Sequence, residues 1–222
     1  MTANSNAHGQ PKDPLRSIPV EQFIELAASG VDVLDVRGGP EYALSHLRGS
    51  IFIGLSQMFP KWVQSLLDPS RALMVIADPG QEAVVMPCLV EVGCSAVHGF
   101  LEGGFASIAG RGELLAGTER IDHIGLASEL EASDAPYLLD VRQPQEWQRG
   151  RIATAPNLPL TEFEGRVAEV PTDCRVILQC QGGYRSLIAA SFLERAGHNS
   201  TVDMAGGFGA WAQAGLPIQP CS

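Results

Sequence analysis

One cysteine of the chain stands where chemistry is expected. Cys180 follows a short apolar run and opens the sequence Cys-Gln-Gly-Gly-Tyr-Arg-Ser. Glycines have no Cβ, so they let the backbone turn tightly and direct successive N–H groups toward one point as an anion-binding nest. A helix that begins near Ser186 adds the partial positive charge of its N-terminus, and Arg185 adds a full charge. These features favour a thiolate, so we expect a sulfur that is nucleophilic near neutral pH.

The alternative for Cys180 is a packing role, because cysteine is among the most buried residue types. The surrounding glycines, arginine and helix start favour a functional role instead. The other four cysteines lack such surroundings. Cys88 and Cys94 are predicted to pack, and Cys221 is expected to be an exposed thiol without a role. Cys174 stands about 20 Å away along an extended strand, too far to act together with Cys180.

Neither a disulfide framework nor a zinc site is predicted. The chain has an odd number of cysteines, five, and no Cys-x-x-Cys pair. Its five histidines are scattered, and none stands at short ligand spacing from a cysteine. We therefore expect no metal site.

A parallel sheet is expected to position Cys180. The apolar run at 175–180 is predicted to be a buried strand, with a helix after it near 186–196 and further strands near 137–141 and 200–204. Short continuous apolar strands that alternate with helices indicate a parallel sheet covered on both faces. Ligands of such sheets bind beyond the carboxyl ends of the strands, which is where Cys180 stands.

The chain contains an internal repeat. Three residues of the first half, Asp35, Arg37 and Glu41, return as Asp140, Arg142 and Glu146. Farther along, Gly-Gly-Phe at 103–105 returns at 206–208. Two matches in the same order at nearly equal offsets indicate a tandem duplication. The first half accordingly repeats the element order, with strands expected at 31–36 and 72–77 and helices near 57–67 and 81–92.

The first half has lost the thiol. Ala77 or Asp78 stands where Cys180 stands in the second half, and the arginine of the loop is absent. A carboxylate at that place would repel anionic donors, so we expect no catalysis there. The predicted division is a disordered tail over 1–14, an inactive domain over 15–115 and a catalytic domain over 116–222.

Composition excludes several classes of partner. The 222 residues carry a formal net charge of −10 and form no run of Lys or Arg, which disfavours nucleic acid as a partner. No apolar stretch approaches the roughly 18 residues that would be read as a membrane span. The first residues lack the apolar segment of a secretory signal, so we expect a cytoplasmic protein.

Taken together, these residues resemble the tandem rhodaneses, a family of sulfurtransferases, over roughly residues 15–220. The family's C-x-x-G-x-R-S loop is matched at Cys180, Gly183, Arg185 and Ser186, its D-V-R…E-aromatic segment at 140–142 and 146–147, and its late G-G-x-x-x-W at Gly206, Gly207 and Trp211. The chain is also similar to the rhodanese part of fusions with persulfide dioxygenases. It departs from the family at 150–157, where Arg151 and Thr154 replace a histidine and a glycine.

The resemblance implies an α/β fold with two tandem rhodanese-like domains, each a central, mainly parallel sheet with helices on both faces. It also implies transfer of a sulfane sulfur through a persulfide on Cys180, with no metal or organic cofactor. The donor would be a small anion, thiosulfate or a low-molecular-weight persulfide, and the acceptor a thiol or cyanide. Substrate-binding roles fall to Gln181, Gly182, Gly183, Tyr184, Arg185 and Ser186, with Arg185 binding the anionic donor and Gln181 and Tyr184 shaping access.

Asp140, Arg142 and Glu146 are expected to support the site. We expect a pairing of Arg142 with Glu146 that clamps the loop after the strand. Two alternatives to a small-molecule enzyme remain at this point. One is a carrier that hands persulfide sulfur to a protein partner, and the other is a phosphatase or arsenate reductase. The loop argues against the second, because such enzymes use C-x5-R and this chain has C-x4-R between Cys180 and Arg185.

Overall fold

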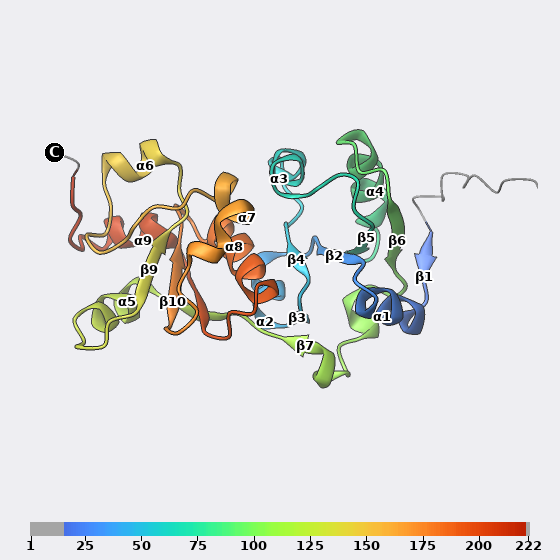
Figure 1. Cartoon of the computed structure of the whole chain (residues 1–222), viewed down its shortest axis with the longest axis horizontal. Coiled ribbons are helices and arrows are strands. Elements are labelled where there is room, and N and C mark those ends of the chain that lie inside the picture. The colour runs from blue at the N-terminus through green and yellow to red at the C-terminus, as the bar shows by residue number, and fades with distance from the viewer. Residues whose placement is uncertain (1–15, 221–222) are drawn as a thin grey trace, which may run out of the picture.

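The computed structural model of the chain describes residues 16–220 (Figure 1). The predicted tail over 1–14 and Cys221 lie outside the described residues. Within this range two parallel sheets lie toward opposite ends of an elongated molecule. The strand order of the first sheet is β1 (Ser17–Ile18), β6 (Val97–Leu101), β5 (Leu73–Ile76), β2 (Asp32–Asp35) and β4 (Ile51–Phe52). The second has the order β8 (Glu119–Ile121), β11 (Thr201–Met204), β10 (Val176–Gln179) and β9 (Tyr137–Asp140).

The two sheets are built alike. All neighbouring strands in both are parallel, and the strand order of the second repeats that of the first. A single parallel bridge from Asp140 to Asn157 stands beside β9, where β4 stands beside β2. The strands predicted at 31–36, 72–77, 137–141, 175–180 and 200–204 are confirmed to within one residue at each end.

Helices cover both faces of each sheet, as the composition of the strands predicts. The first half contains α1 (Val20–Ala28), α2 (Gly39–Leu44), α3 (Phe59–Leu66) and α4 (Glu82–Glu91). The second contains α5 (His123–Leu130), α6 (Pro144–Arg149), α7 (Phe163–Arg166), α8 (Tyr184–Arg195) and α9 (Gly207–Gln213). Short 3-10 turns lie at Phe105–Ser107, Gly112–Leu114, Leu160–Glu162 and Val167–Glu169.

Alternation along the strands explains how both faces become apolar. In β10, Ile177 packs with Leu126 of α5 and Trp211 of α9, while its neighbour Leu178 packs on the opposite face with Leu187 of α8. Successive side chains of a strand point to opposite faces, so a strand buried on both is expected to be apolar along most of its length. The run of branched and aliphatic residues in β10 therefore fixes its place in the middle of the sheet.

Helix α8 joins the two halves. Its residues 186–193 are all buried, because the helix lies between its own sheet and the edge of the first sheet at β4. The N–H of Phe52 donates to the Ser191 hydroxyl at 3.1 Å, and Arg195 donates to the Asp32 carboxylate at 2.6 Å. One apolar cluster contains residues from both halves. The helix that begins at the Cys180 loop is thus part of the contact between the halves.

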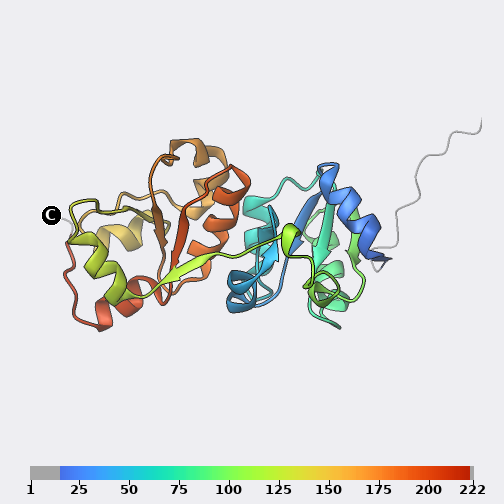
Figure 2. The same ribbon diagram turned by 90° about the horizontal axis from the view of Figure 1, so that it is seen from below.

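The chain crosses from the first sheet to the second at residues 117–118. Just before them, β7 (Leu115–Ala116) pairs antiparallel with β3 (His46–Leu47), and just after them β8 enters the second sheet (Figure 2). In residues 16–220 no helix combines the length and the apolar character that a membrane crossing requires.

Candidate functional site

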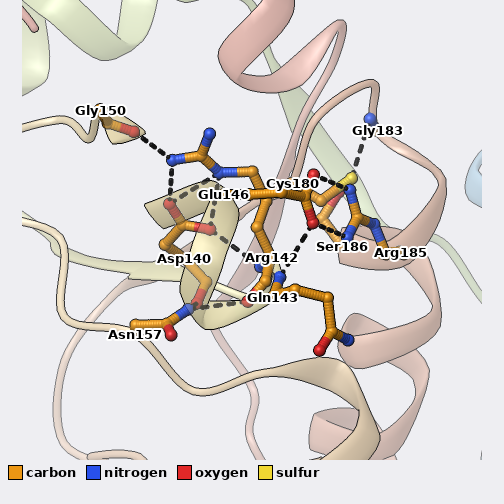
Figure 3. A network of polar contacts seen from close by, with 10 residues as sticks. All are labelled: Asp140, Arg142, Gln143, Glu146, Gly150, Asn157, Cys180, Gly183, Arg185 and Ser186. Atoms are coloured by element: carbon orange, nitrogen blue, oxygen red, sulfur yellow. Dashed lines mark hydrogen bonds and ion pairs between the residues drawn. The ribbon is translucent and has the colours of Figure 1, made fainter. Parts of the chain in front are cut away.

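Cys180 lies at the carboxyl end of β10, in the middle of the second sheet (Figure 3). Its Sγ accepts a hydrogen bond from the N–H of Gly183 at 3.1 Å. Gly183 has a φ of 94°, a left-handed conformation that glycine adopts without steric cost. This turn brings the chain directly into α8, which starts at Tyr184, two residues earlier than predicted. The sulfur therefore faces the N-terminal, partially positive end of a 12-residue helix.

Ser186 gives the sulfur a second polar neighbour. Its Oγ lies 3.5 Å from the Sγ of Cys180 and 2.6 Å from the Oδ1 of Asp203. A hydroxyl carries one hydrogen, and the shorter contact with the carboxylate identifies Asp203 as its acceptor. Arg120 donates to the other oxygen of Asp203 at 3.0 Å, while burial raises the pKa of that carboxyl. Asp203 thus fixes the hydroxyl beside the sulfur, a role that no motif in the sequence indicated.

The glycine pair at the start of α9 holds the loop from the other side. The N–H groups of Phe208 and Gly209 donate to the carbonyl oxygens of Cys180 and Gln181, at 2.7 and 2.9 Å. This approach requires a residue without a side chain at 207, since a Cβ there would lie 2.2 Å from the Cys180 oxygen. Gly207 also has a φ of 55°, in the left-handed region. The late Gly-Gly motif thus shapes the loop that carries the cysteine.

The expected pairing of Arg142 with Glu146 is wrong. Arg142 instead binds the carboxylate of Asp140, with its closest contact at 2.7 Å, and the carbonyl oxygen of Gly150 at 2.8 Å. The ring of Phe208 lies against this guanidinium, 3.9 Å from ring centroid to Cζ. The reason is burial: Asp140 is fully buried at the end of β9 and needs a cationic partner there. Arg142 supplies that partner.

Glu146 turns toward the cysteine loop and binds Arg185. The two terminal guanidinium nitrogens donate to its two carboxylate oxygens at 2.6 and 2.8 Å (Figure 3). The N–H of Gln143 also donates to this carboxylate, at 3.0 Å. Arg185 holds the pKa of Glu146 below its usual value, and Glu146 in turn raises the pKa of Arg185. Both ends of the guanidinium are already occupied, which limits its capacity to bind an added anion.

A pocket of about 520 Å³ opens on Cys180. Although its side chain is only 1% exposed, Cys180 lines this pocket. The second half also contributes Gln143, Thr161, Gly182, Tyr184 and Arg185. Gln181, whose side chain is exposed, does not line the pocket.

The first half supplies the opposite wall, which sequence reasoning missed. It contributes Ser56, Met58, Lys61 and Trp62, at the start of α3 and just before it. The hydroxyl of Tyr184 donates to the carbonyl oxygen of Gly54 at 2.7 Å and ties this segment to the cysteine loop. The sequence predicts a helix near 57–67 in this segment, but no pattern in it indicates what the start of that helix faces. The packing of α8 on β4 decides that it faces Cys180.

The first half preserves the scaffold of the site without its sulfur. Ala77 follows β5 as Cys180 follows β10, and a Cβ at Gly104 would lie 2.8 Å from the Ala77 oxygen. Of the two candidates for the equivalent of Cys180, the geometry therefore selects Ala77. Arg37 repeats the contact of Arg142, with Asp35 as its partner at 2.6 Å. The scaffold that these pairs share explains why the repeat is visible in the sequence.

Comparisons with known proteins place the second half in a described group. The family model of the rhodanese-like domain matches residues 125–214. A sulfurtransferase of Allochromatium vinosum is 36% identical over 98 residues, which are 44% of this chain and 92% of the relative. The chloroplastic thiosulfate sulfurtransferase 16 of Arabidopsis thaliana is 33% identical, over 36% of this chain and 78% of the relative.

One solved structure aligns with both halves. It is a thiosulfate sulfurtransferase of Pseudomonas aeruginosa that is 23% identical to this chain, with a TM-score of 0.43. The alignment covers 94% of this chain and 44% of that protein. The present chain thus corresponds to less than half the length of this neighbour.

Proposed function

Since this chain belongs to the rhodanese-like family of sulfurtransferases, we propose that it transfers a sulfane sulfur by way of a persulfide on Cys180. The donor is thiosulfate or a low-molecular-weight persulfide, and the acceptor is a thiol or cyanide. The observation that carries the proposal is the placement of one sulfur atom. The Sγ of Cys180 meets the Gly183 N–H at the N-terminus of α8 and lines a pocket large enough for a donor.

The reaction has two half-steps. In the first, the Cys180 thiolate attacks the outer sulfur of thiosulfate, the S–S bond of the donor breaks, and sulfite leaves with the electron pair. In the second, a thiolate or cyanide attacks the outer sulfur of the enzyme persulfide. The bond to Sγ then breaks, and its electron pair restores the Cys180 thiolate. The N–H of Gly183 and the N-terminus of α8 favour negative charge on the sulfur throughout.

The neighbouring residues position this centre. Arg185 is held by Glu146, and its charge lies beside the sulfur in the pocket wall. The ion pair of Asp140 and Arg142 fixes the loop that follows β9. This loop lies next to the Cys180 loop, because Asp140 pairs with Gln179 in the register of β9 and β10. Gly182 and Tyr184 border the pocket and limit what reaches the sulfur. No cofactor enters these steps.

We assign catalysis to the second half, 116–222, and none to the first, 15–115. Ala77 at the end of β5 offers no nucleophile, and Asp78 and Pro79 follow it. Proline has no N–H to donate to a neighbouring anion. The first half acts by packing on α8 and by forming one wall of the pocket.

Intact-mass measurement after incubation with thiosulfate tests the proposal. The wild-type protein should gain one sulfur atom and lose it on addition of cyanide, with release of thiocyanate. Cys180→Ser should gain none while it keeps the wild-type melting temperature, and Cys174→Ser, which changes an exposed thiol, should load normally. Undiminished loading of Cys180→Ser would overturn the assignment.

A further inference from the structure

We infer that Lys61 binds the carboxylate of an organic sulfur donor or acceptor, whose carbon chain lies against Met58 and Trp62. The substrate class is therefore a low-molecular-weight thiol, or its persulfide, that carries a carboxylate. This inference rests on the proposed function and specifies which half of the molecule selects the substrate. It assigns recognition to the half that lacks the thiol.

Charge in the pocket points to Lys61. The pocket contains two cationic side chains, Lys61 and Arg185, and none of the lining residues in the described part of the chain is acidic. Arg185 already donates both terminal nitrogens to Glu146. Lys61 is exposed, and its ammonium group has no hydrogen bond or ion pair to any other residue of 16–220. In a chain of net charge −10, this ammonium is thus the uncompensated positive charge among the residues of 16–220 that line the pocket.

The size and lining of the pocket point to an organic molecule. Its volume of about 520 Å³ lies within the range of roughly 300–1,000 Å³ that is usual for organic ligands. Thiosulfate or cyanide would fill a small part of it. Met58 is 44% exposed, and it lies with the indole of Trp62 and the ring of Tyr184 around the space next to the sulfur. When a carbon chain displaces water from such an apolar surface, the free energy falls, and binding is favoured.

The wall is fixed relative to the sulfur. Tyr184 lies in the first turn of α8, and its hydroxyl holds the carbonyl of Gly54 just before the segment that carries Lys61. The side chain of Trp62 is anchored in the core at 6% exposure. Lys61 has a flexible side chain on a fixed helix, which suits a carboxylate at the end of ligands of different length.

The transfer itself is the second half-step with this acceptor. The thiolate of the mercaptocarboxylate attacks the outer sulfur of the Cys180 persulfide, and the bond between that sulfur and Sγ breaks. Sγ keeps the electron pair, and the acceptor leaves as a persulfide with its carboxylate unchanged. The reverse of this step loads Cys180 from an organic persulfide.

Matched acceptors test the inference on the full-length protein. After sulfur loading from thiosulfate has been verified by mass, kcat/KM is measured for mercaptoacetate and mercaptohexanoate and for the neutral mercaptoethanol and mercaptohexanol. Lys61→Gln should lower kcat/KM about fivefold for the acids, the size expected for one solvent-accessible charge pair, and leave the alcohols unchanged. Arg149→Gln removes an exposed charge outside the pocket and should match the wild type for all four acceptors.

A second variant tests the apolar part. Met58→Ser should reduce the advantage of mercaptohexanol over mercaptoethanol, since it removes apolar surface from the pocket wall. Equal effects of Lys61→Gln on acids and alcohols would overturn the inference, as would an effect confined to the thiosulfate half-step, which would make Lys61 a site for the inorganic anion. Failure of the wild-type protein to load sulfur from either thiosulfate or glutathione persulfide would instead refute the proposed function, and the mass measurement separates the two results.

Discussion

Both terminal nitrogens of Arg185 donate to the carboxylate of Glu146, at 2.6 and 2.8 Å. This contact ties the first turn of α8 to the first turn of α6 and so links the cysteine loop to the loop after β9. Arg185 therefore shapes the site while its positive charge is compensated by the Glu146 carboxylate. Among the described residues that line the pocket, the cation without a partner is then Lys61, from the other half of the chain.

The first prediction concerns acid sensitivity. Arg185 lowers the pKa of Glu146 below its ordinary value of 4.5, so the pair stabilises the fold above that pH and loses this contribution as the pH falls through the lowered pKa. Glu146→Gln should cost about 1 kcal/mol near neutral pH. When the pH is lowered, this variant should lose less stability than the wild type, because it lacks the carboxylate whose protonation breaks the pair. Melting temperatures across the acidic range measure this, with the exposed Glu131→Gln as control; parallel curves for Glu146→Gln and the wild type would contradict it.

The second prediction concerns the close approach at Gly207. A methyl group there would collide with the carbonyl oxygen of Cys180. The alanine would also have to adopt a positive φ, which residues with a side chain rarely do. Gly207→Ala should therefore destabilise the protein by at least about 1–3 kcal/mol, the cost of a strained backbone position. It should also slow sulfur loading. Gly165→Ala, at a site with open space, is the control in urea unfolding. Wild-type stability and loading of Gly207→Ala would show that the loop does not need this contact.

The third prediction concerns the link between the halves. Tyr184→Phe removes the donor to the carbonyl oxygen of Gly54, which is buried. An unsatisfied buried acceptor costs about 1–3 kcal/mol, so the melting temperature should fall. Because the same contact fixes the wall that carries Lys61, kcat/KM for mercaptocarboxylates should fall as well. Tyr137→Phe offers a matched control, because the Tyr137 hydroxyl makes no hydrogen bond within residues 16–220. An unchanged melting temperature would argue against the link.

The fourth prediction asks whether a thiol alone suffices. In a Cys180→Ser background, Ala77→Cys places a cysteine at the corresponding strand end of the first half. Because Asp78 follows and Pro79 offers no N–H, this cysteine should not load from thiosulfate. Thiol titration of the unfolded variant would verify that the cysteine is present and reduced. Loading at the wild-type level would show that the loop around Cys180 contributes little to the reaction.

Much of the fold was readable from local patterns. The strand before Ala77 is apolar throughout, and the strand before Cys180 is apolar except for Gln179 at its end, because each is buried on two faces. Such a run is visible in a single stretch of sequence. The helix start expected near Ser186 lies two residues earlier, at Tyr184, since the left-handed turn at Gly183 leads directly into α8. The partner of Arg142 was misjudged because sequence spacing does not say which of two carboxylates is buried beside it.

By itself, the sequence determined that Cys180 stands at a strand end in a glycine loop, because strand, loop and helix start are encoded by adjacent residues. Only the tertiary structure decided that Lys61 and Trp62 line the same pocket as Cys180 and that Glu146 forms an ion pair with Arg185. The contact that aligns this wall joins residues 130 positions apart. It arises from the packing of α8 against β4, and packing between distant apolar surfaces leaves no periodic trace in either segment.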